Sequence, residues 1–98
     1  MNKKQVIHTL KSYESELRRR GVLHAALFGS VARGDNHPDS DIDIMIEVDP
    51  EAHITVFGYV GLKEYIASLF TVSVDVVDRH ALKPYVRPPV EDDSVYAF

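Results

Sequence analysis

Two aspartates on one short apolar segment are the residues of this sequence best placed to do chemistry. The segment DIDIMIEV, residues 41 to 48, alternates polar and apolar residues with a period of two, which predicts a half-buried β-strand. Asp41 and Asp43 then lie on the same face of that strand, about 6 to 7 Å apart. Two like charges in a partly buried site destabilise each other unless a positive partner neutralises them. The pair therefore predicts a cation site.

Magnesium suits such a site, because hard divalent cations bind carboxylate oxygens and keep positions for water and phosphate. Two such ions about 3.5 to 4 Å apart can stabilise both the attacking and the leaving oxygen of a phosphoryl displacement. A third carboxylate is expected from the segment TVSVDVVD, residues 71 to 78, which alternates in the same way. Asp75 has the parity of the open face, whereas Asp78 has the opposite parity and is expected to cap the following turn.

Gly29 and Ser30 supply the second half of a possible nucleotide site. A glycine at a strand end lets phosphate approach the backbone closely, and the following amides, with the Ser30 hydroxyl, are donors for anionic oxygens. Arg33 follows one helical turn later. Its spacing allows a phosphate contact or a salt bridge to Asp35 or Asp39, and the sequence leaves both open.

The elements that must position these residues alternate along the chain. Apolar residues at helical spacing, Val6, Leu10, Tyr13 and Leu17, predict a first helix over residues 3 to 20. The apolar run at 22 to 28 predicts an interior strand, and 41 to 48 and 71 to 78 predict two more. A helix is expected over 52 to 70, although Gly58 and Gly61 weaken it. Three prolines make 82 to 89 irregular, and 90 to 98 is expected to form a last short helix.

Composition narrows the class of protein. The chain has 98 residues, of which 45% are hydrophobic, so a single domain over residues 1–98 is expected. The helices and strands predicted along the chain make this domain α/β. Its formal charge of -4 argues against direct nucleic-acid binding through phosphate neutralisation. There is no cysteine, which excludes disulfides and thiolate metal sites. No unbroken apolar segment suggests a signal peptide or a membrane span, and a cytoplasmic location is expected.

The spacing of the whole stretch is the most informative feature. Gly29-Ser30, ten intervening residues and Asp41-x-Asp43 lie within FGSVARGDNHPDSDIDIMIE, which also contains Arg33-Gly34 and Ser40. This stretch resembles the signature of the nucleotidyltransferase superfamily that includes DNA polymerase beta. Within the superfamily it is similar to the minimal nucleotidyltransferases, single-domain proteins usually encoded beside a HEPN-domain protein.

The resemblance implies a palm-like mixed β-sheet with helices packed on one face. It implies ATP as substrate and Mg²⁺ as cofactor, with nucleotide-binding positions at Gly29, Ser30, Arg33 and Ser40. The implied catalytic and metal-binding residues are Asp41, Asp43 and Asp75.

The resemblance also implies a partner. In toxin–antitoxin members of the family, the nucleotidyltransferase is the antitoxin and transfers AMP from ATP to a tyrosine of the HEPN ribonuclease toxin. Two alternatives share the same residues: a non-catalytic antitoxin that neutralises its partner by complex formation, and a transferase acting on a small molecule or RNA. A homo-oligomer or hetero-oligomer is compatible with the sequence.

Overall fold

Four strands form one mixed sheet in the computed structural model, which describes residues 1–37 and 41–98. The strand order is β3-β2-β1-β4; β1 runs antiparallel to both β2 and β4, and β2 runs parallel to β3. The bounds are β1 (Val22–Phe28), β2 (Ile42–Val48), β3 (Val74–Asp78) and β4 (Val95–Tyr96). The three predicted strands are confirmed, with β3 beginning three residues later than expected. The two-residue β4 was not predicted.

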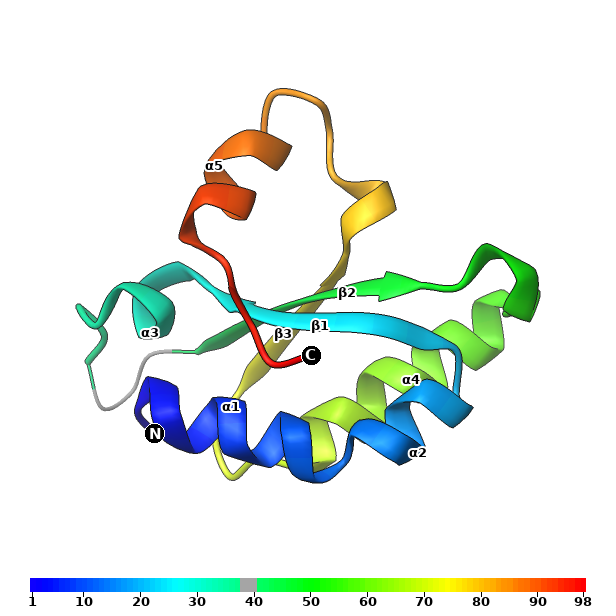
Figure 1. Ribbon diagram of the computed structural model, residues 1–98, viewed down its shortest axis with the longest axis horizontal. Helices are drawn as coiled ribbons and strands as arrows, with labels where there is room; N and C mark the ends of the chain where they lie inside the picture. The colour runs from blue at the N-terminus through cyan, green and yellow to red at the C-terminus, as the bar shows by residue number, and fades with distance from the viewer. Residues whose placement is uncertain (38–40) are drawn as a thin grey trace.

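Helices cover the sheet as Figure 1 shows, with α1 (Lys3–Ser12), α2 (Glu14–Arg19) and α4 (Val56–Ser68) on one face. The short α3 (Gly29–Arg33) follows β1 directly, and α5 (Arg87–Asp93) lies on the other side of the sheet. Two 3₁₀ turns, η1 (Pro50–Ala52) and η2 (Arg79–Ala81), follow β2 and β3. The mixed α/β fold class is thus confirmed. Among the described residues, no helix combines the length and the apolar character needed to span a bilayer.

The core lies between the sheet and the helix layer. Ile42, Ile44 and Ile46 of β2 are at most 1% exposed, as their alternation predicts. They face leucines and isoleucines of the covering helices, among them Leu10 and Ile66. Full burial of each such side chain stabilises the fold by roughly 1.5–3 kcal/mol. This packing fixes the direction of β2 and turns the residues between the isoleucines toward the opposite face.

The first predicted helix is wrong in one respect, because residues 3 to 20 form two helices instead of one. The chain breaks at Tyr13 (φ −108°, ψ 15°), whose N–H donates to the Leu10 carbonyl. Tyr13, expected on the apolar face, is 43% exposed, whereas Leu17 of α2 is fully buried. The break re-aims α2 so that it packs against β1 while Tyr13 turns to solvent.

The C-terminal prediction is also corrected. Pro88 and Pro89 lie in the first turn of α5, where the missing proline N–H has no helical acceptor to lose. The helix ends at Asp93, well before the predicted limit, and the following residues pair with β1 as β4. The expected helix over 52 to 70 is confirmed as α4, preceded by η1.

Gly61 gives a test of the helix assignment. It is exposed inside α4, and a methyl group added there would meet no heavy atom within 4 Å. Gly61→Ala is therefore expected to stabilise the fold by roughly 0.5–1 kcal/mol, because alanine loses less backbone entropy than glycine in a helix. Urea unfolding followed by circular dichroism measures this change, and a loss of stability would contradict the assignment.

Candidate active site

The register of the sheet brings two acids side by side. Asp43 of β2 pairs with Asp75 of the parallel strand β3 and, on its other side, with Phe28 of β1. Neighbouring strands lie about 4.8 Å apart, and residues paired in this way leave the sheet on the same face. The predicted parity of Asp75 is confirmed. The two carboxylates share the face opposite the helix layer formed by α1, α2 and α4.

Asp78 behaves differently, as its parity predicts. It pairs with Ile46, whose side chain is in the core, so it belongs to the helix side of the sheet. Its Oδ1 accepts a hydrogen bond from the His80 N–H at 3.0 Å and caps η2. Asp78 is therefore a structural cap at the end of β3.

Asp41 belongs to the same group as Asp43 and Asp75 because its negative charge acts on Asp43. Asp41 is exposed and immediately precedes β2, two residues before Asp43. Burial raises the pKa of Asp43 above its ordinary value, and the negative charges of Asp75 and Asp41 raise it further, while Arg33 opposes them. Asp41 and Asp75 thus both lie close enough to Asp43 to repel its negative charge, and a cation would relieve this repulsion.

Gly29 lies directly against this acidic group. Its φ of 76° is in the left-handed region, and a Cβ added there would overlap the Asp43 carboxylate. Sequence reasoning assigned this glycine to phosphate approach alone. The structure gives it a second role, since only a residue without a side chain leaves room for Asp43. The backbone turn and the acids expected to hold phosphate and cation are therefore adjacent in space.

Ser30 and Arg33 lie on α3, the helix that begins at this glycine. Ser30 is half-buried, and its carbonyl accepts the N–H groups of Gly34 and Asp35, which close the turn. Arg33 donates from Nε to Asp35 at 3.2 Å and from Nη1 to Asp93 of α5 at 2.9 Å. The structure thus shows the predicted salt bridge to Asp35 and adds an unpredicted one.

Two residues of the sequence analysis lie outside the described part of the chain. Asp39 was the second possible salt-bridge partner of Arg33, and Ser40 was a predicted nucleotide-binding residue. The assignment of Ser40 stays a prediction.

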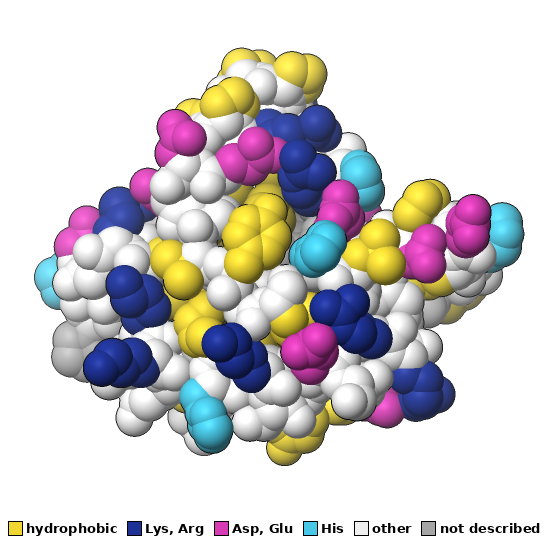
Figure 2. Space-filling model, viewed as in Figure 1, with side chains coloured by type: hydrophobic (Ala, Val, Ile, Leu, Met, Phe, Trp, Pro, Cys, Tyr) yellow, Lys and Arg dark blue, Asp and Glu magenta, His cyan; other side chains and the backbone are white. Residues whose placement is uncertain are grey.

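A second charged group lies on the same side of the sheet, beside α5 (Figure 2). Arg79 donates to Glu47 of β2 at 3.2 Å and to Glu91 of α5 at 2.9 Å. His24 and His80 lie 3.6 and 3.7 Å from the Glu47 carboxylate. Arg79 was not singled out in the sequence, since its partners are 32 and 12 residues away. This group connects α5 to the sheet.

The acids of this group are the candidate ligands for a metal ion. Within residues 1–37 and 41–98, no three His, Asp or Glu side chains converge closely enough to hold one ion. The chemistry of the donors nevertheless suits a hard cation, since the charges of Asp41 and Asp75 both act on Asp43, whose carboxylate lies against the Gly29 backbone. The assignment of Asp41, Asp43 and Asp75 as metal ligands stays a prediction.

Comparisons with known proteins agree with this geometry. Residues 10–97 match the family model described as "Nucleotidyltransferase domain". A Methanocaldococcus jannaschii protein named "Putative protein adenylyltransferase MJ1379" is 39% identical over 76 residues, which cover 76% of each chain. The "Protein adenylyltransferase MntA" of Thermococcus cleftensis is 36% identical over 88 residues, covering 89% of this chain and 87% of that protein.

Solved structures show the same architecture. A minimal nucleotidyltransferase structure superimposes with a TM-score of 0.80 and 28% identity, covering 97% of this chain and 95% of the other. A chain from the complex of a tri-AMPylated Shewanella oneidensis HEPN toxin with an MNT antitoxin gives a TM-score of 0.65 at 19% identity, covering 94% and 71%. At that identity the second likeness concerns the fold alone.

Proposed function

The chain belongs to the nucleotidyltransferase domain family, and from this premise we propose that it is a protein adenylyltransferase that moves AMP from ATP to a tyrosine of a HEPN-domain toxin. One observation carries the proposal: the sheet register places Asp43 between Asp75 and the backbone of Gly29. The proposed phosphate and cation sites would thereby be adjacent, as nucleotidyl transfer requires. The relatives named protein adenylyltransferases support a protein hydroxyl as acceptor.

The residues have separate roles in this proposal. The Gly29 turn and the Ser30 hydroxyl bind phosphate oxygens, with Ser40 assigned to the same subsite by the sequence resemblance. Asp41, Asp43 and Asp75 would hold Mg²⁺, which when bound supplies charge neutralisation for the phosphates and the leaving group. Asp75 also accepts the proton of the acceptor hydroxyl. These groups contribute positioning and electrostatic stabilisation, so a small scaffold suffices.

Arg33 must give up one of its ion pairs before it can bind a phosphate oxygen of ATP. Its guanidinium is held by Asp35 and Asp93, and its positive charge already acts on Asp43. Exposed ion pairs of this kind contribute only about 0–1 kcal/mol. Exchange of one of them for a phosphate oxygen therefore costs little, and Arg33 is proposed to make that exchange when ATP binds.

The proposed activity is tested by incubating the chain with labelled ATP, Mg²⁺ and the product of its neighbouring gene, which the proposal expects to be a HEPN-domain protein. Transfer of label to that protein is expected, with the mass of AMP on a tyrosine in peptide mass spectrometry. Label on added RNA or on a small molecule instead would support the other acceptor classes. Neutralisation of the toxin by the Asp41→Asn/Asp43→Asn double variant, undiminished and without transfer, would establish inhibition by complex formation.

A further inference from the structure

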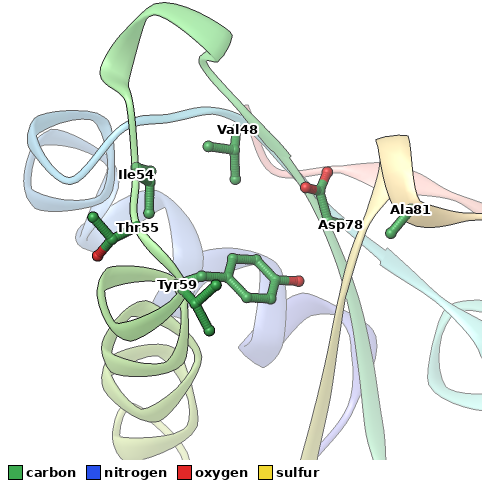
Figure 3. Close-up of a pocket in the computed structure, with 7 residues that line it drawn as sticks. Val48, Ile54, Thr55, Tyr59, Asp78 and Ala81 are labelled. Carbon is green, nitrogen blue, oxygen red and sulfur yellow. The ribbon is translucent and has the colours of Figure 1, made fainter.

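A pocket lies on the helix side of the sheet, away from Asp41, Asp43 and Asp75. Its volume is about 310 Å³, and it is lined by residues that include Val48, Ile54, Val56, Tyr59, Asp78 and Ala81. Figure 3 shows the Tyr59 side chain extending from α4 into the pocket, with its hydroxyl directed toward the Asp78 side. Asp78 is three residues beyond Asp75 on β3, about 10 Å along the strand and on the opposite face. The pocket is therefore separate from the proposed nucleotide site.

The pocket combines apolar walls with one negatively charged end. The walls come from aliphatic side chains such as Ile54 and Val56, and the charged end is the Asp78 carboxylate. Burial and the negative charge of Asp78 raise the pKa of Tyr59, so the phenol senses that charge. The Tyr59 ring is already 5.7 Å from the Nζ of Lys63, a cation outside the lining. An apolar stem with a cationic head, as in arginine or lysine, matches this lining.

The first turns of α4, which contribute Val56 and Tyr59 to the pocket lining, also expose large hydrophobic side chains. Val56, Phe57 and Val60 are 79%, 89% and 47% exposed, and all three lie in the first turns of α4. We call these three residues the α4 surface. Leu62 and Ile66 of the same helix are buried in the core, so α4 carries apolar residues on both of its sides. A cluster of this kind beside a pocket is typical of a protein interaction site.

We infer that the pocket binds an arginine or lysine side chain of a partner protein, whose neighbouring apolar residues cover the α4 surface. Charge complementarity identifies the occupant. The Asp78 carboxylate at the end of the pocket selects a cation, and the α4 surface selects a hydrophobic protein segment. This surface would hold the partner while the acids on the other face act on it. The identity of the partner as a HEPN protein rests on the proposed function, but the ligand chemistry of the pocket does not.

The ligand chemistry is tested first with a side-chain mimic. Butylguanidinium is titrated into ¹⁵N-labelled protein, with butyrate as the anionic control of equal chain length. Saturable shifts are expected at the amides of Ile54, Val56 and Tyr59 with butylguanidinium alone. Asp78→Asn should reduce its affinity at least fivefold while keeping the cap on η2, because asparagine also caps. Equal shifts with butyrate, or unchanged affinity in the variant, would overturn the assignment.

Docking is then tested by calorimetry with the HEPN partner. Phe57→Ser is expected to weaken binding at least tenfold and to raise the KM for the partner while leaving the KM for ATP unchanged. Tyr85→Ser is the matched control, since Tyr85 is an equally large, 73% exposed side chain that lies outside α4. Unchanged binding by Phe57→Ser would overturn the docking surface and leave the proposed transfer intact.

Two further outcomes separate the docking surface from the proposed function. Tight binding by the wild-type chain without AMP transfer, lost in Phe57→Ser, supports docking and contradicts the enzyme activity. If sedimentation shows a wild-type dimer that Phe57→Ser converts to a monomer with unchanged affinity for the partner, the occupant is a second copy and the inference is wrong.

Discussion

Asp43→Asn is expected to reduce AMP transfer by at least about a thousandfold, the largest effect of any single conservative change. The cation that Asp43 is proposed to hold is worth several kcal/mol of transition-state charge stabilisation. Each 1.36 kcal/mol corresponds to a tenfold change in rate. Asparagine keeps the shape of the side chain but removes the charge between Gly29 and Asp75. Initial rates with labelled ATP and the HEPN partner measure the loss.

The same substitution is expected to leave the metal-free fold at least as stable as the wild type. Folding raises the pKa of Asp43, so its ionised form at neutral pH opposes folding, and this penalty grows as the pH rises through that pKa. Asparagine has no such penalty. Urea unfolding at pH 4, near the ordinary pKa of the carboxyl, and at pH 8, in the presence of a chelator, should show a smaller decline with pH for the variant.

Asp92→Asn provides the matched control, because Asp92 is an exposed acid of α5 outside the acidic group. It should retain wild-type transfer. Transfer by Asp43→Asn within tenfold of the wild type would contradict the role of this acid, whereas unfolding of the variant would contradict the electrostatic interpretation.

The second large effect is expected at Gly29. Gly29→Ala places a Cβ in the left-handed region, which costs about 1–2 kcal/mol, and forces the Asp43 carboxylate to move. A displacement of about 1 Å in a catalytic group can cost a hundredfold in rate. Loss of at least a hundredfold in transfer is therefore expected, together with a clear loss of stability. Unfolding curves and transfer rates are measured on the same preparations.

Two other glycines separate the causes of this effect. Gly34 has a φ of 81°, but a Cβ there meets nothing within 4 Å, so Gly34→Ala carries the backbone cost without the collision. Gly61→Ala has neither the backbone cost nor the collision. We expect Gly34→Ala to lose about 1–2 kcal/mol of stability and keep most of its transfer activity. Equal losses of transfer in the Gly29 and Gly34 variants would show that backbone strain, and not displacement of Asp43, is responsible.

The sequence predicts the parts of this molecule that periodicity controls. Alternation placed Ile42 and Ile44 in the core and assigned Asp43 and Asp75 to one open face, and the observed register agrees. Parity propagates along an entire strand, so a few residues determine it. The same reasoning correctly made Asp78 a cap.

Features that depend on distant or very short segments were not predictable in this way. The two residues of β4 are too few to show a period. The prolines of α5 indicate a helix break unless they are known to lie in the first turn of a helix. Arg33 meets Asp93 across 60 residues, which no local pattern specifies. The pocket at Tyr59 is likewise assembled from segments after β2, after β3 and in α4.

The pairing of Phe28 with Asp43 has a consequence for how such sites diversify. Backbone hydrogen bonds between β1 and β2 set the distance from Gly29 to Asp43. This distance therefore does not depend on the number of residues that connect the two strands. Lengthening a connection changes its closure free energy slowly, by about 0.6 kcal/mol per doubling. The connection can therefore gain or lose residues while the distance between the Gly29 turn and Asp43 stays unchanged.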